Sequence, residues 1–169
     1  MKPADLPPNP FDGRTDFRRA LVLVLAQARS RMLWLDRDLA DWPIEEPAVA
    51  ALVARFCAQR AAPGEDGGAR LRILVRDARW LEQAAPRLGA LRRRAAGSID
   101  CRIVPPGLER AGGGALLVDG AHSVVRFHAD HFRGRFALDR PEEVEALAPR
   151  CEALWRASEP CAPATPLGL

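Results

Sequence analysis

The spacing of hydrophobic and polar residues changes several times along this chain, and the changes predict its helices and strands. Between positions 15 and 29, Phe17, Leu21 and Val24 recur at helical spacing, so one face of this predicted helix is buried. The short, mostly apolar runs at Met32–Leu35 and Leu71–Val75 predict buried strands. Further helices are expected over 47–60, over 78–96 with an interruption near Pro86, and from Asp139, and further strands at Ile99–Val104, at Ala115–Val118, at His122–His128 and near 132–136. Helices that alternate with strands in this way predict an α/β domain with a sheet flanked by helices.

A segment that contains several prolines lies at each end of the predicted domain. The first ten residues are polar and rich in proline, which predicts an extended lead-in over 1–10. Residues 11–157 then form one domain, a size that suits a single core. The proline-containing segment 158–169 is predicted to be a disordered tail.

Composition narrows the class of protein. The 169 residues carry a net charge of +3, and the only lysine is Lys2, so almost every basic side chain is an arginine. The longest apolar run, Ala20–Ala26, is too short to cross a bilayer, and the amino-terminal segment lacks the apolar core of a signal peptide. We therefore expect a cytoplasmic protein without a membrane partner.

The four cysteines, Cys57, Cys101, Cys151 and Cys161, do not form a C-x-x-C pair. Cys57 and Cys151 lie in predicted helices and Cys101 in a predicted strand, which favours buried free thiols in a reducing compartment. We expect no metal and no cofactor. His128, Asp130 and His131 could meet at a metal only through a turn, and a solvated polar face is the preferred interpretation.

Four segments resemble, in their order, one half of the phospholipase D fold: "RMLWLDRDL", "LRILVRD", "IDCRIVP" and "ALLVDGAHSVVRF". The chain is more closely similar to a family of uncharacterised bacterial phospholipase-D-like domains. Those domains end in a helix with a motif like "CEALWRAS", and some are fused to acetyltransferase domains. The resemblance implies a phospholipase-D-like half-domain whose mixed β-sheet is flanked by helices on both faces, and it also implies a homodimer.

Active members of the phospholipase D superfamily carry the motif H-x-K-x-x-x-x-D, in which the histidine attacks phosphorus and the lysine stabilises the phosphate charge. If Asp119 occupies the aspartate position, Gly112 stands at the histidine position and Gly114 at the lysine position. Glycine supplies neither a nucleophile nor a charge. Of this motif only the aspartate remains, so we expect no phosphodiesterase chemistry by this route and no catalytic residue.

A cluster of polar residues near the "VDG" turn is the candidate ligand site: Asp119, His122, Arg126, His128 and Arg102. Strand alternation places His122, Val124, Arg126 and His128 on one face, and Ser123, Val125 and Phe127 on the opposite face, which is expected to point inward. Arg126, His128, Arg102 and the glycine triplet could form an anion pocket. The alternative for Arg126 is a structural ion pair with Asp119 or Asp130.

The loop after the first predicted strand also carries carboxylates. Asp36 and Asp38, together with Asp41, could mimic a two-carboxylate catalytic pair, although loop carboxylates in this position usually cap helices or face water. We predict a non-catalytic binding, interaction or regulatory module, with an anionic phosphorylated molecule or nucleic acid as ligand and an acetyltransferase as a possible protein partner. The alternative is a divergent phosphodiesterase or nuclease that uses Asp119, His122, Arg126 and His128.

Overall fold

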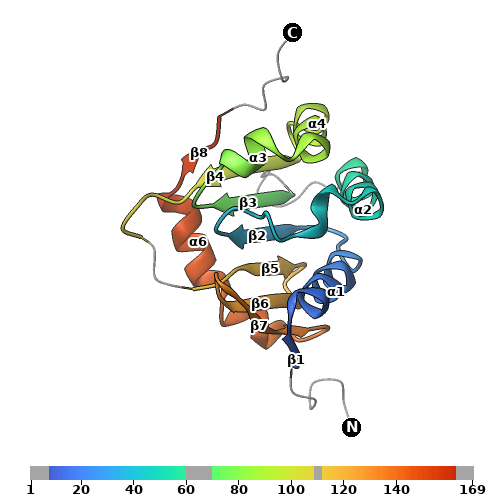
Figure 1. The fold of residues 1–169 in the computed structure, drawn as a ribbon, viewed down its shortest axis with the longest axis vertical. Helices are drawn as coiled ribbons and strands as arrows, with labels where there is room; N and C mark the ends of the chain where they lie inside the picture. The colour runs from blue at the N-terminus through green and yellow to red at the C-terminus, as the bar shows by residue number, and fades with distance from the viewer. Residues whose placement is uncertain (1–7, 60–69, 109–111, 163–169) are drawn as a thin grey trace.

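A computed structural model describes residues 8–59, 70–108 and 112–162 (Figure 1). Its centre is one eight-stranded sheet in the order β1-β7-β6-β5-β2-β3-β4-β8. The strands are β1 (Asn9–Asp12), β2 (Met32–Asp36), β3 (Leu71–Val75), β4 (Ile99–Ile103), β5 (Ala115–Val118), β6 (His122–His128), β7 (His131–Ala137) and β8 (Glu159–Pro160). The helices are α1 (Arg14–Leu25), the 3-10 turn η2 (Pro43–Glu45), α2 (Pro47–Ala58), α3 (Arg79–Gln83), α4 (Pro86–Arg94), α5 (Pro141–Glu145) and α6 (Ala148–Ala157).

The sheet is mixed, as expected. Strands β2, β3 and β4 run parallel to one another, and every other neighbouring pair is antiparallel. Because β5 runs opposite to β2, and β6 runs opposite to β5, the end of β2 lies at the same edge as the start of β5 and the end of β6. This edge holds the candidate site described below.

Helices cover both faces of the sheet, which confirms the predicted fold class. Alternation along β2 shows the two layers, because Trp34 packs into the larger core with α1, α2, α3 and α4, whereas Leu33 and Leu35 pack into a second core with α5 and α6. All five residues of β2 are buried, as a central strand with two covered faces requires. In Figure 1, α1, α2 and α4 are gathered toward one end of the strands and α6 toward the other.

Two edge strands extend the sheet beyond the limits expected for the domain. β1 begins at Asn9 and pairs with β7, and β8 pairs with β4. Each contains a proline, Pro10 or Pro160, which cannot donate a backbone hydrogen bond and is tolerated at a sheet edge. The remainder of the predicted lead-in and tail, residues 1–7 and 163–169, lies outside the described residues.

Two of the helical segments are divided near their prolines. The interruption predicted near Pro86 is confirmed, because the segment 78–96 is two helices, α3 and α4, which separate before Pro86. The final predicted helix is also two, α5 and α6, and Pro149 lies in the first turn of the second rather than kinking its middle. Among the described residues, no helix has the length and apolar content to cross a bilayer.

The predicted orientation of β6 is wrong. Val124 and Arg126 are buried in the core beneath α1, whereas Phe127, expected to point inward, is 44% exposed. The reason is that α1 covers the face that carries the arginine, and its Phe17 ring lies against the Arg126 guanidinium. A β-bulge between Arg126 and His128 then changes the alternation at the end of the strand.

Candidate functional site

The edge at which β2 ends brings together three segments that are far apart in the sequence. Asp36 is the last residue of β2, Gly113 and Gly114 precede β5, and Arg126 lies near the end of β6. Gly113 N donates to Phe127 O at 3.0 Å, and Arg126 N donates to Gly114 O at 2.8 Å, so the glycines continue the β5–β6 ladder. The resemblance to the phospholipase D superfamily places its histidine and lysine positions, Gly112 and Gly114, in this segment.

A buried ion pair occupies the centre of this edge. Arg126 Nη2 donates to Asp36 Oδ1 at 2.7 Å, and the two side chains are only 2% and 1% exposed. Asp36 also accepts a hydrogen bond from Trp42 Nε1 at 2.5 Å and one from Arg37 N at 2.6 Å. The carboxylate is therefore fully satisfied by protein groups, which is the condition for keeping a charge buried.

The other nitrogen of the Arg126 fork binds a second carboxylate. Arg126 Nη1 donates to Asp41 Oδ2 at 3.1 Å, and Asp41 also pairs with Arg14. Burial alone would raise the pKa of Asp41, but the hydrogen bonds from Arg14 and Arg126 outweigh it and hold this pKa below its ordinary value. The guanidinium of Arg126 thus forms ion pairs with two aspartates.

Aromatic rings enclose the same guanidinium. Its central carbon lies 5.1 Å from the centroid of the Phe17 ring and 5.4 Å from that of Phe132. Both distances are within the range of cation–π attraction. Arg126 Nε has no hydrogen-bond partner among the described residues, so the arginine is held by its two terminal nitrogens and the rings.

The backbone at Gly113 and Gly114 passes so close to its neighbours that no side chain fits at either position. A Cβ atom at Gly114 would lie 2.5 Å from Asp36 Oδ2 and 3.0 Å from Leu35 O. A Cβ atom at Gly113 would lie 1.9 Å from Arg126 O. The distances of 2.5 Å and 1.9 Å are shorter than a Cβ tolerates. The lysine position of the resemblance is therefore closed to any side chain by the carboxylate of Asp36.

Asp119 lies at the opposite end of β5 and has a different role. Its carboxylate accepts hydrogen bonds from Arg29 N, Ser30 N and Arg31 N at 2.8–2.9 Å, and from Ser30 Oγ at 2.7 Å. Burial alone would raise the pKa of Asp119, but these hydrogen bonds have the larger effect and hold this pKa below its ordinary value. Asp119 fastens the segment between α1 and β2 to the β5–β6 turn.

The five residues of the predicted ligand site do not converge. Asp119 and His122 lie at the β5–β6 turn, where His122 Nδ1 accepts a hydrogen bond from Asp139 N at 3.0 Å. Arg102 lies on β4, donates to Trp155 O at 3.2 Å and stacks on the Trp155 ring at 4.3 Å. Arg126 and His128 lie at the other end of β6. The expected ion pair of Arg126 with Asp119 or Asp130 is also wrong, because the sheet order places Asp36 and Asp41 beside it.

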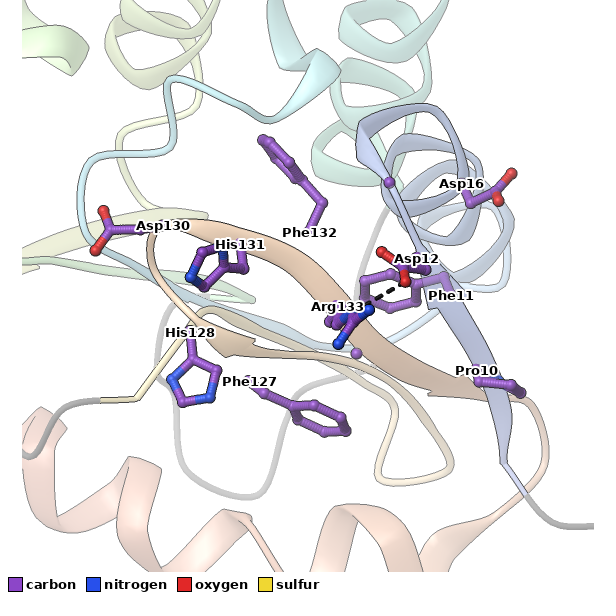
Figure 2. A pocket seen from close by; sticks show the side chains of 12 residues that line it. Pro10, Phe11, Asp12, Asp16, Phe127, His128, Asp130, His131, Phe132 and Arg133 are labelled. Carbon is purple, nitrogen blue, oxygen red and sulfur yellow. Dashed lines mark hydrogen bonds and ion pairs between the residues drawn. The ribbon is translucent and has the colours of Figure 1, made fainter.

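An open depression of about 1200 Å³ lies next to this edge, between β1 and the β6–β7 hairpin (Figure 2). His128, Asp130 and His131 stand at the hairpin tip, and Phe127 and His128 lie on the opposite side of the hairpin from Phe132. The His128 and His131 rings meet edge to face with their centroids 6.3 Å apart. The described residues contain no group of three or more His, Cys, Asp or Glu side chains arranged to hold a metal ion.

Two exposed arginines at this edge are held by aspartates. Arg37, which follows β2, donates to Asp130 Oδ1 at 3.0 Å, and its pKa is raised chiefly by that bond. Arg79, at the start of α3 beyond β3, is 80% exposed and pairs with Asp77. Its charge and that of Arg37 are therefore accessible to a ligand that can exchange for the carboxylates.

The role of Asp36 and Asp41 as the ion-pair partners of Arg126 is not predicted from the sequence. Both carboxylates follow a buried strand, a place where α/β sheets often bind ligands, but the sequence alone favours helix caps or contact with solvent. The signal that pointed to them is Trp42, a large side chain with one donor in an acidic loop, since a buried indole N–H needs an acceptor.

Comparisons with known proteins assign a family and a fold. Residues 13–165 match the model of a domain of unknown function (DUF7931), so the chain belongs to this family. No curated protein sequence matches the chain.

Two solved structures are similar to this fold. One is TrmBL2, an archaeal chromatin protein described as having a novel mode of DNA binding; it has a TM-score of 0.61 and 11% identity, over 93% of this chain and 56% of that chain. The other is Nuc from Salmonella typhimurium, a phospholipase D family member, with a TM-score of 0.51 and 14% identity, over 85% of this chain and 90% of that chain. The chain thus spans little more than half of TrmBL2. The likeness to Nuc shows a phospholipase-D-like fold.

Proposed function

We propose that this member of the DUF7931 family is a non-catalytic binding module that combines a phospholipase-D-like fold with a closed central site. The observation that carries the proposal is the contact between Gly114 and Asp36, since a Cβ at position 114 would lie 2.5 Å from the carboxylate. The space that a phosphate-binding lysine would need is filled by a carboxylate, which repels phosphate.

The chemistry of the buried network supports the same conclusion. Phosphoryl transfer through a histidine needs an accessible nucleophile and a cation that can approach the phosphate oxygens. The buried cation here, Arg126, is neutralised by Asp36 and Asp41 and enclosed by two phenylalanine rings. A substrate phosphate would have to break both ion pairs to reach it.

The ligand proposed for this module is nucleic acid, bound around the buried Asp36–Arg126 ion pair rather than at it. We call this surface the rim; it carries Arg37 and Arg79 together with His128 and His131 at the hairpin tip. Arginine recognises phosphate in two-pronged fashion, and phosphate contacts supply most of the affinity of proteins for nucleic acid. Phe127, exposed beside His128, offers a ring on which an unpaired base can stack. The DNA-binding neighbour is compatible with this ligand.

Fluorescence anisotropy of the full chain with labelled single-stranded and double-stranded DNA tests the proposal. We expect binding that weakens as salt rises, and a loss of about tenfold in affinity for the Arg37→Ala, Arg79→Ala double variant, as expected for two lost phosphate contacts. The matched control is the Arg93→Ala, Arg94→Ala double variant, which removes two exposed arginines from the last turn of α4 and should retain the affinity of the unmodified chain.

Two outcomes would contradict the proposal. Equal losses for the rim variant and the Arg93→Ala, Arg94→Ala control would show that only net charge matters. Turnover of a generic phosphodiester such as bis(p-nitrophenyl) phosphate, abolished by His128→Ala or His122→Ala, would instead support the divergent hydrolase that uses Asp119, His122, Arg126 and His128.

A further inference from the structure

Two of the four cysteines face each other at the edge of the sheet opposite β1. Cys101 is the middle residue of β4, and Cys161 directly follows β8. The pairing of Arg102 with Pro160 and of Ile103 with Glu159 continues to Cys101 and Cys161, and Cys161 N donates to Cys101 O at 2.8 Å. The two residues are therefore directly opposite neighbours in an antiparallel ladder.

This placement suits a disulfide bond. Opposite residues of a hydrogen-bonded antiparallel pair have Cα atoms about 5.5 Å apart and side chains on the same face of the sheet. Disulfides have Cα separations of about 5.5–6 Å. The electrostatics agree with this placement, because a hydrogen bond between the two side chains has the largest influence on the pKa of each thiol.

We propose that Cys101 and Cys161 form a reversible disulfide that fastens β8 to β4. Cys101 is buried and Cys161 is partly exposed, so an oxidant in solution reaches Cys161 first. The remaining cysteines, Cys57 in α2 and Cys151 in α6, are buried in helices and belong to different cores.

Surrounding charges favour Cys161 as the attacking sulfur. The hydrogen bond from the Cys101 thiol lowers the pKa of Cys161, and Arg92 lowers it further, against burial and the carboxylates Glu82 and Asp100, which raise it. Arg92 is close by, because its Nη2 donates to Ala162 O at 3.2 Å. The same sulfur–sulfur hydrogen bond raises the pKa of Cys101, which remains a thiol until the second step.

With hydrogen peroxide as oxidant, the chemistry balances in two steps. The Cys161 thiolate attacks the peroxide oxygen, breaks the O–O bond and becomes a sulfenic acid, and the departing hydroxide takes up the thiol proton to leave as water. Cys101 then gives up its proton and attacks the Cys161 sulfur, and the sulfenic hydroxyl leaves as a second water. Two thiols and one peroxide thus give one disulfide and two waters, and dithiothreitol reverses the change.

The test treats the reduced full chain with equimolar hydrogen peroxide, blocks free thiols with iodoacetamide and maps the peptides without reduction. We expect one linkage, between the Cys101 and Cys161 peptides, with Cys57 and Cys151 alkylated. Oxidation should raise the thermal midpoint of the unmodified chain and of Cys57→Ala by the same amount, and dithiothreitol should abolish the shift. Cys161→Ser should show neither the linkage nor the shift.

Three results would overturn the proposal. These are a linkage between two chains, a linkage that involves Cys57 or Cys151, and accumulation of a Cys161 sulfinic acid without any cross-link. Mapping of the unmodified chain does not depend on how well any variant folds. It is also independent of DNA binding, so the disulfide and the proposed function stand or fall separately.

Discussion

At position 114 the backbone passes so close to Asp36 that the smallest additional carbon has no room. A Cβ there would meet the rigid, fully hydrogen-bonded carboxylate at 2.5 Å and the Leu35 carbonyl at 3.0 Å. Neither neighbour is the free end of a flexible chain, so relief requires movement of β2 or β5. The lack of space at this one position is what excludes a side chain from the centre of the site.

Gly114→Ala should therefore destabilise the protein by about 1–3 kcal/mol, the usual cost of overpacking a core. The control is Gly97→Ala, since a Cβ at Gly97 meets nothing within 4 Å. Urea unfolding followed by circular dichroism measures both. Equal stabilities for the two variants would show that the contact with Asp36 is not a constraint.

The buried arginine gives a second prediction at this scale. Arg126→Met leaves the charges of Asp36 and Asp41 without their cation and should cost about 3–5 kcal/mol, the range for removing one partner of a buried ion pair. Adding Asp36→Asn should recover part of that loss, because the buried charge is then also removed. Arg133→Met, which breaks an exposed pair with Asp12, should change stability by only about 0.5 kcal/mol.

Asp119 should contribute to the pH dependence of stability. A carboxylate with a folded pKa below its unfolded value, here near 3.8, stabilises the folded state above that value and ceases to do so as the pH falls through the folded pKa. Asp119→Asn replaces one acceptor oxygen with a donor and should cost about 1–3 kcal/mol at neutral pH. The difference from the unmodified chain should shrink below about pH 4. A difference that stays constant in urea titrations from pH 7 to 3 would contradict this origin.

At the scale of elements, hydrophobic periodicity predicted the central strands well because their burial is dictated by the sheet itself. β2, β3 and β5 are short apolar runs, and their positions were predicted within a residue or so. β1 and β8 were missed because they are short, contain proline and are held by pairing with β7 and β4 rather than by their own apolar pattern. Local sequence carries little information about such edges.

The candidate site shows why the remainder could not be predicted. The sequence singled out Arg126 as a candidate ligand-binding residue, but its partners depend on β5 lying between β2 and β6, which places Asp36 beside a residue ninety positions away in the chain. Sequence alternation alone also assigned β6 to the wrong face, because nothing local says which face α1 covers. Sheet order is a property of the whole fold, and the ion pair follows from it.

At the scale of the whole molecule, the resemblance to the phospholipase D superfamily predicts a symmetric dimer, the commonest oligomer of soluble proteins. Light scattering at micromolar concentration should then give twice the mass of 18.5 kDa. The measurement belongs under reducing conditions, so that no disulfide between chains can produce the same mass. A monomer mass across the concentration range would remove this prediction.

On the proposed function, the closeness of Gly114 to Asp36 also bears on any attempt to install the complete phospholipase D motif in this fold. Installing a lysine at 114 alone would collide with the carboxylate, and removing Asp36 alone would leave Arg126 and Trp42 short of their partner. A designer would have to exchange several mutually dependent residues at once, because each intermediate with a single replacement is less stable than the starting protein. Installing the motif one residue at a time would therefore pass through variants that are less stable than the starting protein.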